Sequence, residues 1–443
     1  MVEPREPVAT VAFIDHYCLP YQNLFPEIRN FEAFKFLQLG MISEIPRKSL
    51  PAIARTTGLK DGQSLHHFLR DSPWDVTAFR AIRLWLTKVS IGEREVVLCI
   101  DETGDEKKGN STNYVAKQYI GNLGKTKNGI VSVNAYAVVD GITFPLMFKV
   151  FKPRSRLQSG DEYKTKPQLA VEIIQELQAL NLKIKMVLAD SLYGESGDVI
   201  GVLSKLKLHF IVAIRSNHPV WLPPGQRVRY NRWRAYKQAL SHRQSEPRFI
   251  REIVFGQRQT IRYYQISKSS NPNPAPEDTW FIMTNLPGKI QLEVAQFYSL
   301  RNWIEYGFKQ IKNELGWADF RLTDYQSIER WWELVFSAYL LVSLQANHFQ
   351  LDAIRSAPKL TYSFTASASF QQVFSKHSWW ESGITWKSAL NNLRLIIQPF
   401  IFYCLIRPWL QVFKIPGFQR GFLKLIDIMN GFRASPINLA AAS

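Results

Sequence analysis

The chain has 443 residues, of which 46% are hydrophobic and 13% aromatic, and this composition excludes a disordered protein. Lysine and arginine number 55 against 37 acidic residues, so the net charge of +18 indicates a polyanionic partner such as nucleic acid. A ribosome-associated or membrane-surface protein is the alternative that this charge leaves open. Cys18, Cys99 and Cys404 are far apart in the sequence, which argues against a disulfide framework or a zinc site.

The N-terminal region is predicted to be helical over residues 24–90, because apolar residues recur there with a period near 3.6. Within it, SLPAIARTTGLKDGQSLHHFLR predicts two short helices, at 49–56 and 62–70, joined by a turn at Gly58. This spacing is typical of a helix-turn-helix, although any tight helical hairpin has a similar sequence. We therefore expect residues 1–92 to form a helical DNA-binding domain. The first residues, MVEPREPVAT, do not resemble a signal peptide, so we expect a cytoplasmic, nucleoid-associated protein.

The hydrophobic pattern changes at residue 93. The apolar run VVLCI ends in Asp101 and predicts a strand buried on both faces. The elements predicted after it are strands IVSVNAYAVV and ITFPLMFKVF joined by a turn at Asp140 and Gly141, a helix at 167–181, a strand KIKMVLAD ending in Asp190, a helix near 195–206 and a strand LHFIVAI. This order consists of three antiparallel strands followed by a helix, a strand, a helix and a strand. It is the order of an RNase H-like core, which we expect over residues 93–215.

Residues 216–278 interrupt this core. They contain a basic run from Arg227 to Lys237 and alternating strands at RFIREIVFG and TIRYYQIS, which predict an inserted β-rich module. The strand TWFIMTNL returns the chain to the core, whose second part is expected at 279–350. Residues 351–443 are expected to be helical, with Trp379, Trp380 and Trp386 in the core. The apolar run 395–406 is predicted to be a buried helix, too short to span a bilayer.

Two aspartates end strands that lie side by side in the predicted order. Asp101 and Asp190 would bring two like charges together, and this is costly unless a cation or a proton neutralises them. A third carboxylate, Glu305, would join them if the segment that carries it lies across those strands. Three oxygen ligands without histidine or cysteine suit Mg²⁺ or Mn²⁺ rather than zinc. By strand parity Glu102 faces away from Asp101, so Asp101 is the predicted ligand.

The third carboxylate lies in YSLRNWIEYGFKQIKNELGW, residues 298–317, which predicts one amphipathic helix. At about 100° per residue, four polar side chains share an arc of about 60°: Tyr298, Arg301, Glu305 and Lys312. A solvated helix face with an Arg301–Glu305 pair is the simpler interpretation of this stretch alone. The aspartates at 101 and 190 favour a functional face instead.

These motifs resemble those of bacterial insertion-sequence transposases of the DDE type, in the group with a Y-x2-R-x3-E-x6-K signature. Tyr298, Arg301, Glu305 and Lys312 match its four positions and three spacings. CIDETGDEKKG resembles the first-aspartate motif of the family, ADSLYG the second, and AKQYIGNLGKTKNG the segment after the first strand in one branch. Glu305 follows Asp190 by 115 positions (305 minus 190), which fits the β-strand insertion of this group.

The resemblance implies an α/β fold, with an RNase H-like catalytic core, an inserted β-rich module, an N-terminal helical DNA-binding domain and C-terminal helices. It also implies that the protein binds the ends of an insertion sequence, cleaves the backbone and joins the 3′ ends to target DNA by metal-dependent transesterification. A homodimer is expected in the DNA complex, with no membrane partner. A catalytically silent domesticated DNA-binding protein and an RNase H-like nuclease that only hydrolyses are the alternatives.

The implied site has two parts. Asp101, Asp190 and Glu305 would be the catalytic residues and the ligands of two Mg²⁺ ions, with Mn²⁺ as a substitute. The expected DNA-binding residues are basic or phenolic side chains that can contact phosphates: Tyr298, Arg301, Lys312, Lys309, Arg227, Arg229, Arg232, Arg234 and Lys237.

Overall fold

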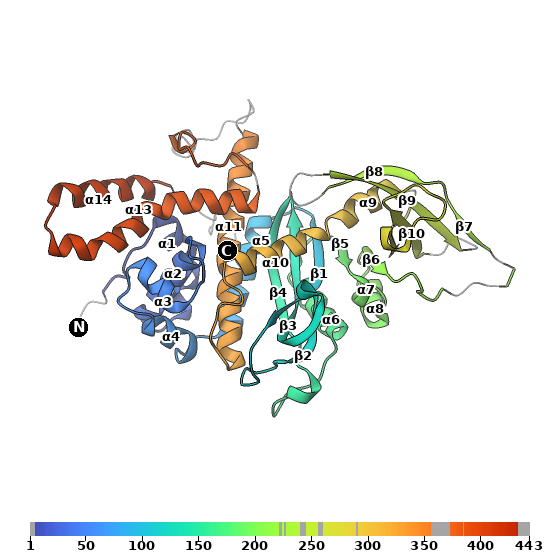
Figure 1. Cartoon of the computed structure of the whole chain (residues 1–443), viewed down its shortest axis with the longest axis horizontal. Helices are drawn as coiled ribbons and strands as arrows, with labels where there is room; N and C mark the ends of the chain where they lie inside the picture. Colours follow the sequence, from blue (N-terminus) through green and yellow to red (C-terminus); the bar gives the residue numbers. More distant parts are fainter. Residues whose placement is uncertain are drawn as a thin grey trace. The chain divides into compact units, whose positions relative to one another are not determined.

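The computed structural model describes residues 5–432, apart from 221–223, 226, 240–244, 256–259, 289–290, 356–372 and 384. The chain forms two compact units (Figure 1), one made of residues 1–92 with 309–443 and the other of residues 93–308. The limit between the units falls within helix α10 (Asn302–Asn313). The expected C-terminal helical region lies partly outside the described residues.

The first unit is helical in its described residues and is built around the long helix α11 (Tyr325–Arg355). The other helices of this unit are α1 (Ala12–Cys18), the 3-10 helix η1 (Leu19–Leu24), α2 (Ile28–Ile42), α3 (Leu50–Thr57), α4 (Gln63–Arg70), α5 (Val76–Ile91), α13 (Trp386–Val412) and α14 (Pro416–Asn430). Helices α2, α4, α5 and α13 all pack against α11. A buried ion pair of 2.9 Å joins Arg83 on α5 to Glu333 on α11, and both side chains are inaccessible to solvent. The segments at the two ends of the sequence therefore share one core.

The two short helices predicted around Gly58 are confirmed as α3 and α4. Ser49 caps α3, because its hydroxyl accepts a hydrogen bond from the Ala52 amide. Gly58 follows α3 with φ of 79°, a left-handed conformation that glycine adopts without strain. Helix α4 buries an apolar stripe and exposes one polar face, formed by Gln63, Ser64, His66, His67 and Arg70. This geometry leaves a polar helix face open to a partner.

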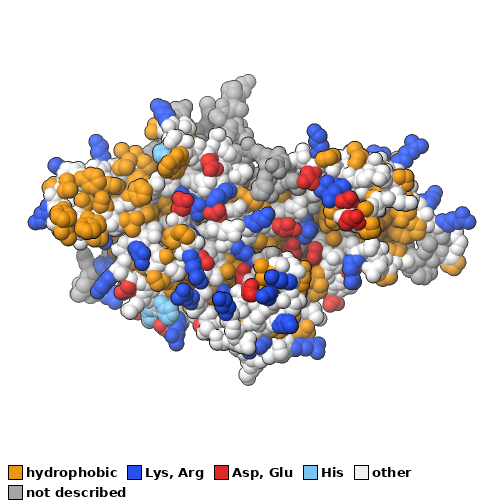
Figure 2. All heavy atoms as spheres, in the orientation of Figure 1, with side chains coloured by type: hydrophobic (Ala, Val, Ile, Leu, Met, Phe, Trp, Pro, Cys, Tyr) orange, Lys and Arg blue, Asp and Glu red, His pale blue; other side chains and the backbone are white. Residues whose placement is uncertain are grey.

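The C-terminal helices correct two expectations. Trp386 is buried as expected, but Trp379 is 68% exposed and Trp380 is only partly buried, so neither belongs to the core. The predicted buried helix at 395–406 lies within α13, whose first half is buried while Phe402 and Leu405 are exposed. Hydrophobic side chains gather on the surface over α13 and α14 (Figure 2). By length and composition alone α13 could cross a membrane, but it contains Pro399 and Pro408 and its first half packs inside the protein.

The second unit is a mixed α/β structure around one large sheet. In the described residues its strands are β1 (Val96–Glu106), β2 (Ala116–Ile120), β3 (Lys125–Val139), β4 (Ile142–Val150), β5 (Ile184–Ala189), β6 (Phe210–Ile214), β7 (Val228–Tyr230), β8 (Arg234–Ala239), β9 (Ser245–Phe255), β10 (Arg262–Ser267) and β11 (Thr279–Thr284). Their order is β2-β3-β1-β5-β6-β11-β10-β9-β7, with β4 paired to β3 and β8 paired to β9. The pairs β1–β5 and β5–β6 are parallel and the other pairs are antiparallel. This large central mixed sheet fits an RNase H-like fold.

Helices flank this sheet. They are α6 (Lys166–Ala179), α7 (Ser191–Gly194), α8 (Gly197–Lys205) and α9 (Gln291–Ser299), together with the short 3-10 helices η2 (Gly121–Leu123), η3 (Arg154–Arg156) and η4 (Pro276–Asp278). Helix α6 packs against β3 and β4, α7 against β6, and α9 against β8 and β9. The predicted helices at 167–181 and 195–206 are thus confirmed as α6 and α8. Strand β2 and helix α7 were not predicted.

The predicted hairpin at Asp140 and Gly141 is confirmed. Val139 pairs with Ile142, and the two residues between them have φ of 50° and 77°. Positive φ at both central residues is the requirement of the two-residue turn that matches the twist of a β-hairpin. The turn fixes the register between β3 and β4, and β3 in turn pairs with the strand that carries Asp101.

The ADSLYG motif forms a tight connection from β5 into α7. Asp190 caps α7, because its Oδ1 accepts a hydrogen bond of 2.9 Å from the Leu192 amide. Gly194 is the last residue of α7 and lies against β6. A Cβ atom at this position would lie 2.1 Å from the carbonyl oxygen of Ala213. Only glycine fits there, so Gly194 holds the segment that positions Asp190 close to β6.

We expect Gly194→Ala to lower the free energy of unfolding by about 2–3 kcal/mol, because the new methyl group collides with backbone. Gly201→Ala is the matched control, since a Cβ at Gly201 on α8 meets no atom within 4 Å. That control should stabilise the protein by about 0.5–1 kcal/mol, as alanine favours a helix over glycine. Urea unfolding of both variants measures the difference. Equal stability would show that β6 does not constrain the motif.

Candidate active site

Asp101 and Asp190 come from neighbouring parallel strands. Ile100 on β1 pairs with Ala189 on β5, so each aspartate directly follows a paired residue at the same edge of the sheet. The Asp101 side chain is only 13% exposed. Burial raises the pKa of Asp101 to about 7, the positive charge of Arg301 opposes this rise and the charge of Asp190 adds to it. The structure thus brings the two predicted aspartates close enough to influence each other.

Arg301 lies between two of the predicted carboxylates. Its Nη1 is 3.1 Å from Asp101 Oδ2, and its Nη2 is 3.4 Å from Glu305 Oε1. Burial alone would lower the pKa of Arg301, but Tyr298 and the surrounding carboxylates raise it above its ordinary value. Burial also raises the pKa of the Tyr298 phenol. The guanidinium therefore stays charged and neutralises Asp101.

The segment 298–317 is not the single helix that the sequence predicts. Helix α9 ends at Ser299 and α10 begins at Asn302 and ends at Asn313, so Leu300 and Arg301 form a turn between two helices. In this turn the Arg301 amide donates to the Tyr298 carbonyl and the Ile304 amide to the Arg301 carbonyl. The four signature residues consequently do not share one helix. Glu305 and Lys312, seven positions apart on α10, still point the same way.

The turn and α10 are held by packing on the sheet. The Cys99 thiol on β1 lies 3.6 Å from the Leu300 carbonyl oxygen. A Cβ at Gly307 would come within 2.9 Å of the Tyr136 ring on β3, so the absence of a side chain allows close contact there. Ile304 is fully buried, while the Glu305 side chain is 53% exposed. Glu305 therefore faces the solvent beside Arg301.

The donor set suits a hard divalent cation by its chemistry, because all three side chains offer carboxylate oxygens. In the arrangement found, however, no three acidic, histidine or cysteine side chains of the described residues are grouped closely enough to hold a metal ion together. The positive charge at Asp101 and Glu305 is instead the Arg301 guanidinium. Joint ligation by the three carboxylates would require Arg301 to release at least one of them.

Glu102 lies on the opposite side of β1 from Asp101, in agreement with strand parity. Lys166, at the start of α6, forms an ion pair of 2.7 Å with Glu102, and the Tyr193 hydroxyl donates a hydrogen bond of 3.4 Å to it. Burial raises the pKa of Tyr193, and the charges of the nearby carboxylates add to the rise. Lys166 and Tyr193 are not among the residues predicted from the sequence. The tyrosine of ADSLYG was the available signal, whereas nothing near Lys166 in sequence marks it.

The other predicted DNA-binding residues are on exposed surfaces. Lys309 is exposed on α10, and Lys312 is partly exposed in the last turn of that helix. The five predicted in the basic run are all exposed, on or next to β7 and β8: Arg227, Arg229, Arg232, Arg234 and Lys237. Helix α9, which carries Tyr298, packs against β8 and β9, and the Tyr236 phenol on β8 lies close enough to Tyr298 for the two to interact. The basic strands are therefore anchored beside the predicted site.

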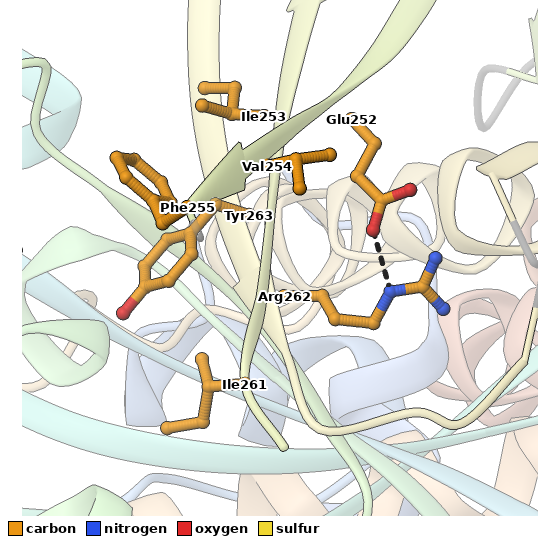
Figure 3. Close-up of a pocket in the computed structure, with 7 residues that line it drawn as sticks. All are labelled: Glu252, Ile253, Val254, Phe255, Ile261, Arg262 and Tyr263. Carbon is orange, nitrogen blue, oxygen red and sulfur yellow. Dashed lines mark hydrogen bonds and ion pairs between the residues drawn. The ribbon is translucent and has the colours of Figure 1, made fainter. Parts of the chain in front are cut away.

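A small pocket lies elsewhere on the sheet, between β9 and β10 (Figure 3). It is lined by Glu252, Ile253, Val254, Phe255, Ile261, Arg262 and Tyr263. Arg262 Nε is 2.8 Å from Glu252 Oε1, so each of these charges compensates the other. Strands β5, β6 and β11 separate β10 from β1. The pocket is therefore remote from the carboxylates.

Two aspartates at one edge of a mixed sheet, with Arg301 and Glu305 beside them, form the candidate site. Residues 22–272 match the DDE superfamily endonuclease family, so the chain belongs to this family. This match includes Asp101 and Asp190 and ends before Glu305. The chain is also 53% identical over 331 residues to a probable transposase for insertion sequence element IS701 from Microchaete diplosiphon, covering 74% of this chain and 87% of the relative. Endonucleases of this superfamily generally use divalent metal ions.

We expect Arg301→Gln to bind Mn²⁺ about tenfold more tightly than the unchanged protein in the absence of DNA, a difference of about 1.4 kcal/mol. The reason is that the guanidinium and a metal ion compete for the oxygens of Asp101 and Glu305. Arg301→Lys, which keeps the charge, is the control and should show a smaller change. Electron paramagnetic resonance of free Mn²⁺ measures both. Weaker binding by Arg301→Gln would mean that Arg301 orders the carboxylates rather than competing for them.

Proposed function

We propose that this endonuclease is an insertion-sequence transposase, which binds the ends of its element, cleaves the backbone and joins the 3′ ends to target DNA. The observation that carries the proposal is the convergence of Asp101, Asp190 and the Arg301–Glu305 pair at one edge of the sheet. The similarity to a probable IS701 transposase over most of both chains supports it. In this proposal the sheet is an RNase H-like core, and residues 216–278 are an inserted module.

Asp101, Asp190 and Glu305 are the residues that would hold two Mg²⁺ ions, or Mn²⁺ in their place. Such ions activate the attacking hydroxyl and stabilise the leaving oxygen of a phosphodiester. A DNA phosphate that approaches this edge offers Arg301 a new anionic partner. A guanidinium binds phosphate and carboxylate groups equally readily. Arg301 would therefore exchange its carboxylate partners for a DNA phosphate and free the carboxylate oxygens. Substrate binding would thereby complete the site.

The positions of the other basic and phenolic side chains predict the remaining phosphate contacts. The Tyr298 hydroxyl, Arg301 and Lys312 hold the scissile strand, and Lys309 and the arginines of the β7–β8 segment contact its flanks. The polar face of α4 enters the major groove at the ends of the element. Two copies of the chain assemble on the DNA, because both ends must be cut together. The protein acts in the cytoplasm, associated with the nucleoid.

Alanine at Asp101, Asp190 or Glu305 should abolish both cleavage and strand joining, while DNA binding persists. Ligands of this kind act on the transition state, whereas affinity comes mainly from phosphate contacts. Glu102→Gln is the matched control, an acidic residue of the same strand on the opposite face, and it should retain cleavage. Gel-shift and cleavage assays on the same preparations measure both properties. Full cleavage by Glu305→Ala would end the three-carboxylate assignment, and cleavage without joined product would indicate a hydrolytic nuclease.

Replacing the exposed residues of α4 should remove the preference for element ends. Base contacts contribute about 1–3 kcal/mol each, so the triple variant Ser64→Ala, His66→Ala, Arg70→Ala should lose at least about tenfold in specific over non-specific binding. Deleting residues 1–92 is unsuitable, because α2, α4 and α5 pack against α11. Arg420→Ala with Lys424→Ala, exposed on α14, is the control. If footprinting shows that the preference for element ends is unchanged, the β7–β8 segment rather than α4 recognises the DNA sequence.

A further inference from the structure

Strand β1 continues well beyond the site. Its pairing with β5 ends at Ile100, yet β1 pairs with β3 as far as Glu106, opposite Gly129. Beyond that point β3 pairs with β2, so that Lys117 lies opposite Asn128 and Ile120 opposite Lys125. Residues 116–128 therefore form a two-stranded ribbon at the end of the sheet that carries Asp101. We call this segment, with the preceding residues 107–109, the lysine ribbon.

The lysine ribbon is fixed to the sheet rather than loosely attached. Ile120 is fully buried, and a Cβ at Gly104 or Gly129 would come within 3.2 Å or 2.6 Å of its side chain. The Gln118 amide donates a hydrogen bond of 2.7 Å to the Gly129 carbonyl, and the Asn128 amide donates one of 2.6 Å to the Gly109 carbonyl. Its position relative to Asp101 is thus set by continuous strand pairing.

The exposed side chains of the lysine ribbon are strongly basic. Lys108, Lys117 and Lys125 are exposed, and none of them makes an ion pair with the residues that the structure describes. The nearby Lys127 pairs with Glu106 at 3.5 Å. Tyr119, 54% exposed, adds a hydroxyl that can donate to a phosphate. Unpaired lysines gathered at one edge repel one another, and a polyanion removes that repulsion.

The register places Lys117 and Tyr119 on the face of the sheet that carries Asp101, whereas Lys125, nine residues from Asn134 on β3, lies on the other face. Asp101 pairs with Asn134 and Lys117 with Asn128, and the two asparagines are six residues apart on the same strand. An even number of residues returns to the same face of a sheet, so Lys117 and Tyr119 share a face with Asp101. At about 3.4 Å per residue, Lys117 lies about 20 Å from Asp101 along the strand. That distance corresponds to about six base pairs of duplex.

We propose that the lysine ribbon is a DNA-binding arm that contacts the duplex backbone about six base pairs from the cleaved bond. The proposal rests on the proposed function, because it takes Asp101 as part of the cleavage site. The arm supplies phosphate contacts without reading bases, since lysine charges recognise the backbone of any sequence. It holds the duplex at a fixed distance from the site, so that the scissile phosphate is directed at the two aspartates.

The first test compares the salt dependence of binding to a duplex that extends beyond the cleavage site on both sides. Lys108→Gln, Lys117→Gln and Lys125→Gln are combined in one full-length variant. The slope of log affinity against log salt should become less steep by about 0.9 for each lysine that contacts a phosphate. The control combines Lys183→Gln, Lys205→Gln and Lys207→Gln, which lie exposed near the starts of β5 and β6, at the opposite end of the strands. Thermal unfolding checks that both variants are folded.

The second test locates the contact. The natural cysteines Cys18, Cys99 and Cys404 are all buried, so a cysteine introduced by Lys117→Cys can be labelled selectively with a photo-crosslinker. Cross-links should map about six base pairs from the cleaved bond, and a Lys183→Cys label should give none there. One outcome is that the unchanged protein cleaves the DNA while the ribbon and control variants show equal salt slopes and no cross-link forms. That result would contradict the DNA-binding arm but leave the proposed transposase function intact. If the unchanged protein neither binds nor cleaves element ends, both proposals fall.

Discussion

The buried Asp101 carboxyl needs a positive charge beside it, and in this structure Arg301 supplies that charge. Burial raises the pKa of Asp101, and the charge of Asp190 on the adjacent strand raises it further. Arg301 itself lies in the turn between α9 and α10. Contacts with Cys99 and Tyr136 hold this turn and α10 against the sheet. The packing of these helices on the sheet therefore places the positive charge that lowers the cost of burying Asp101 beside Asp190.

Strand pairing joins residues 216–278 to the rest of the sheet. Strand β11 pairs with both β6 and β10, so the sheet continues from the strands beside Asp190 into β9 and β7 without a break. Helix α9 crosses back against β8 and β9 before the chain reaches Arg301. The strands that carry the basic side chains of β7 and β8 therefore belong to the same sheet as the strands that precede the two aspartates.

The sequence alone predicted most of the central sheet, because buried parallel strands and the Asp140–Gly141 turn have strong local signals. It missed β2, whose only buried residue is Ile120, since a mostly polar edge strand looks like a loop. It also missed the break at Leu300 and Arg301, because the apolar period runs through a turn that contains neither proline nor glycine. Arg301 in that break forms an ion pair with Asp101, 200 residues away, and no local pattern records this contact.

In the proposed function, strand β1 links the cleavage site to the residues that contact DNA. Its first half, residues 96–100, is apolar and buried, and this fixes the position along the strand at which Asp101 follows the buried core. Its second half extends past the end of β5 and carries the ribbon through Gly104 and the pairing with Gly129. A strand is stiff along its length and its side chains alternate strictly, so the distance from Asp101 to Lys117 and the face that these two side chains share are set together. One strand therefore determines both where a phosphodiester would be attacked and how far along the duplex the protein would hold it.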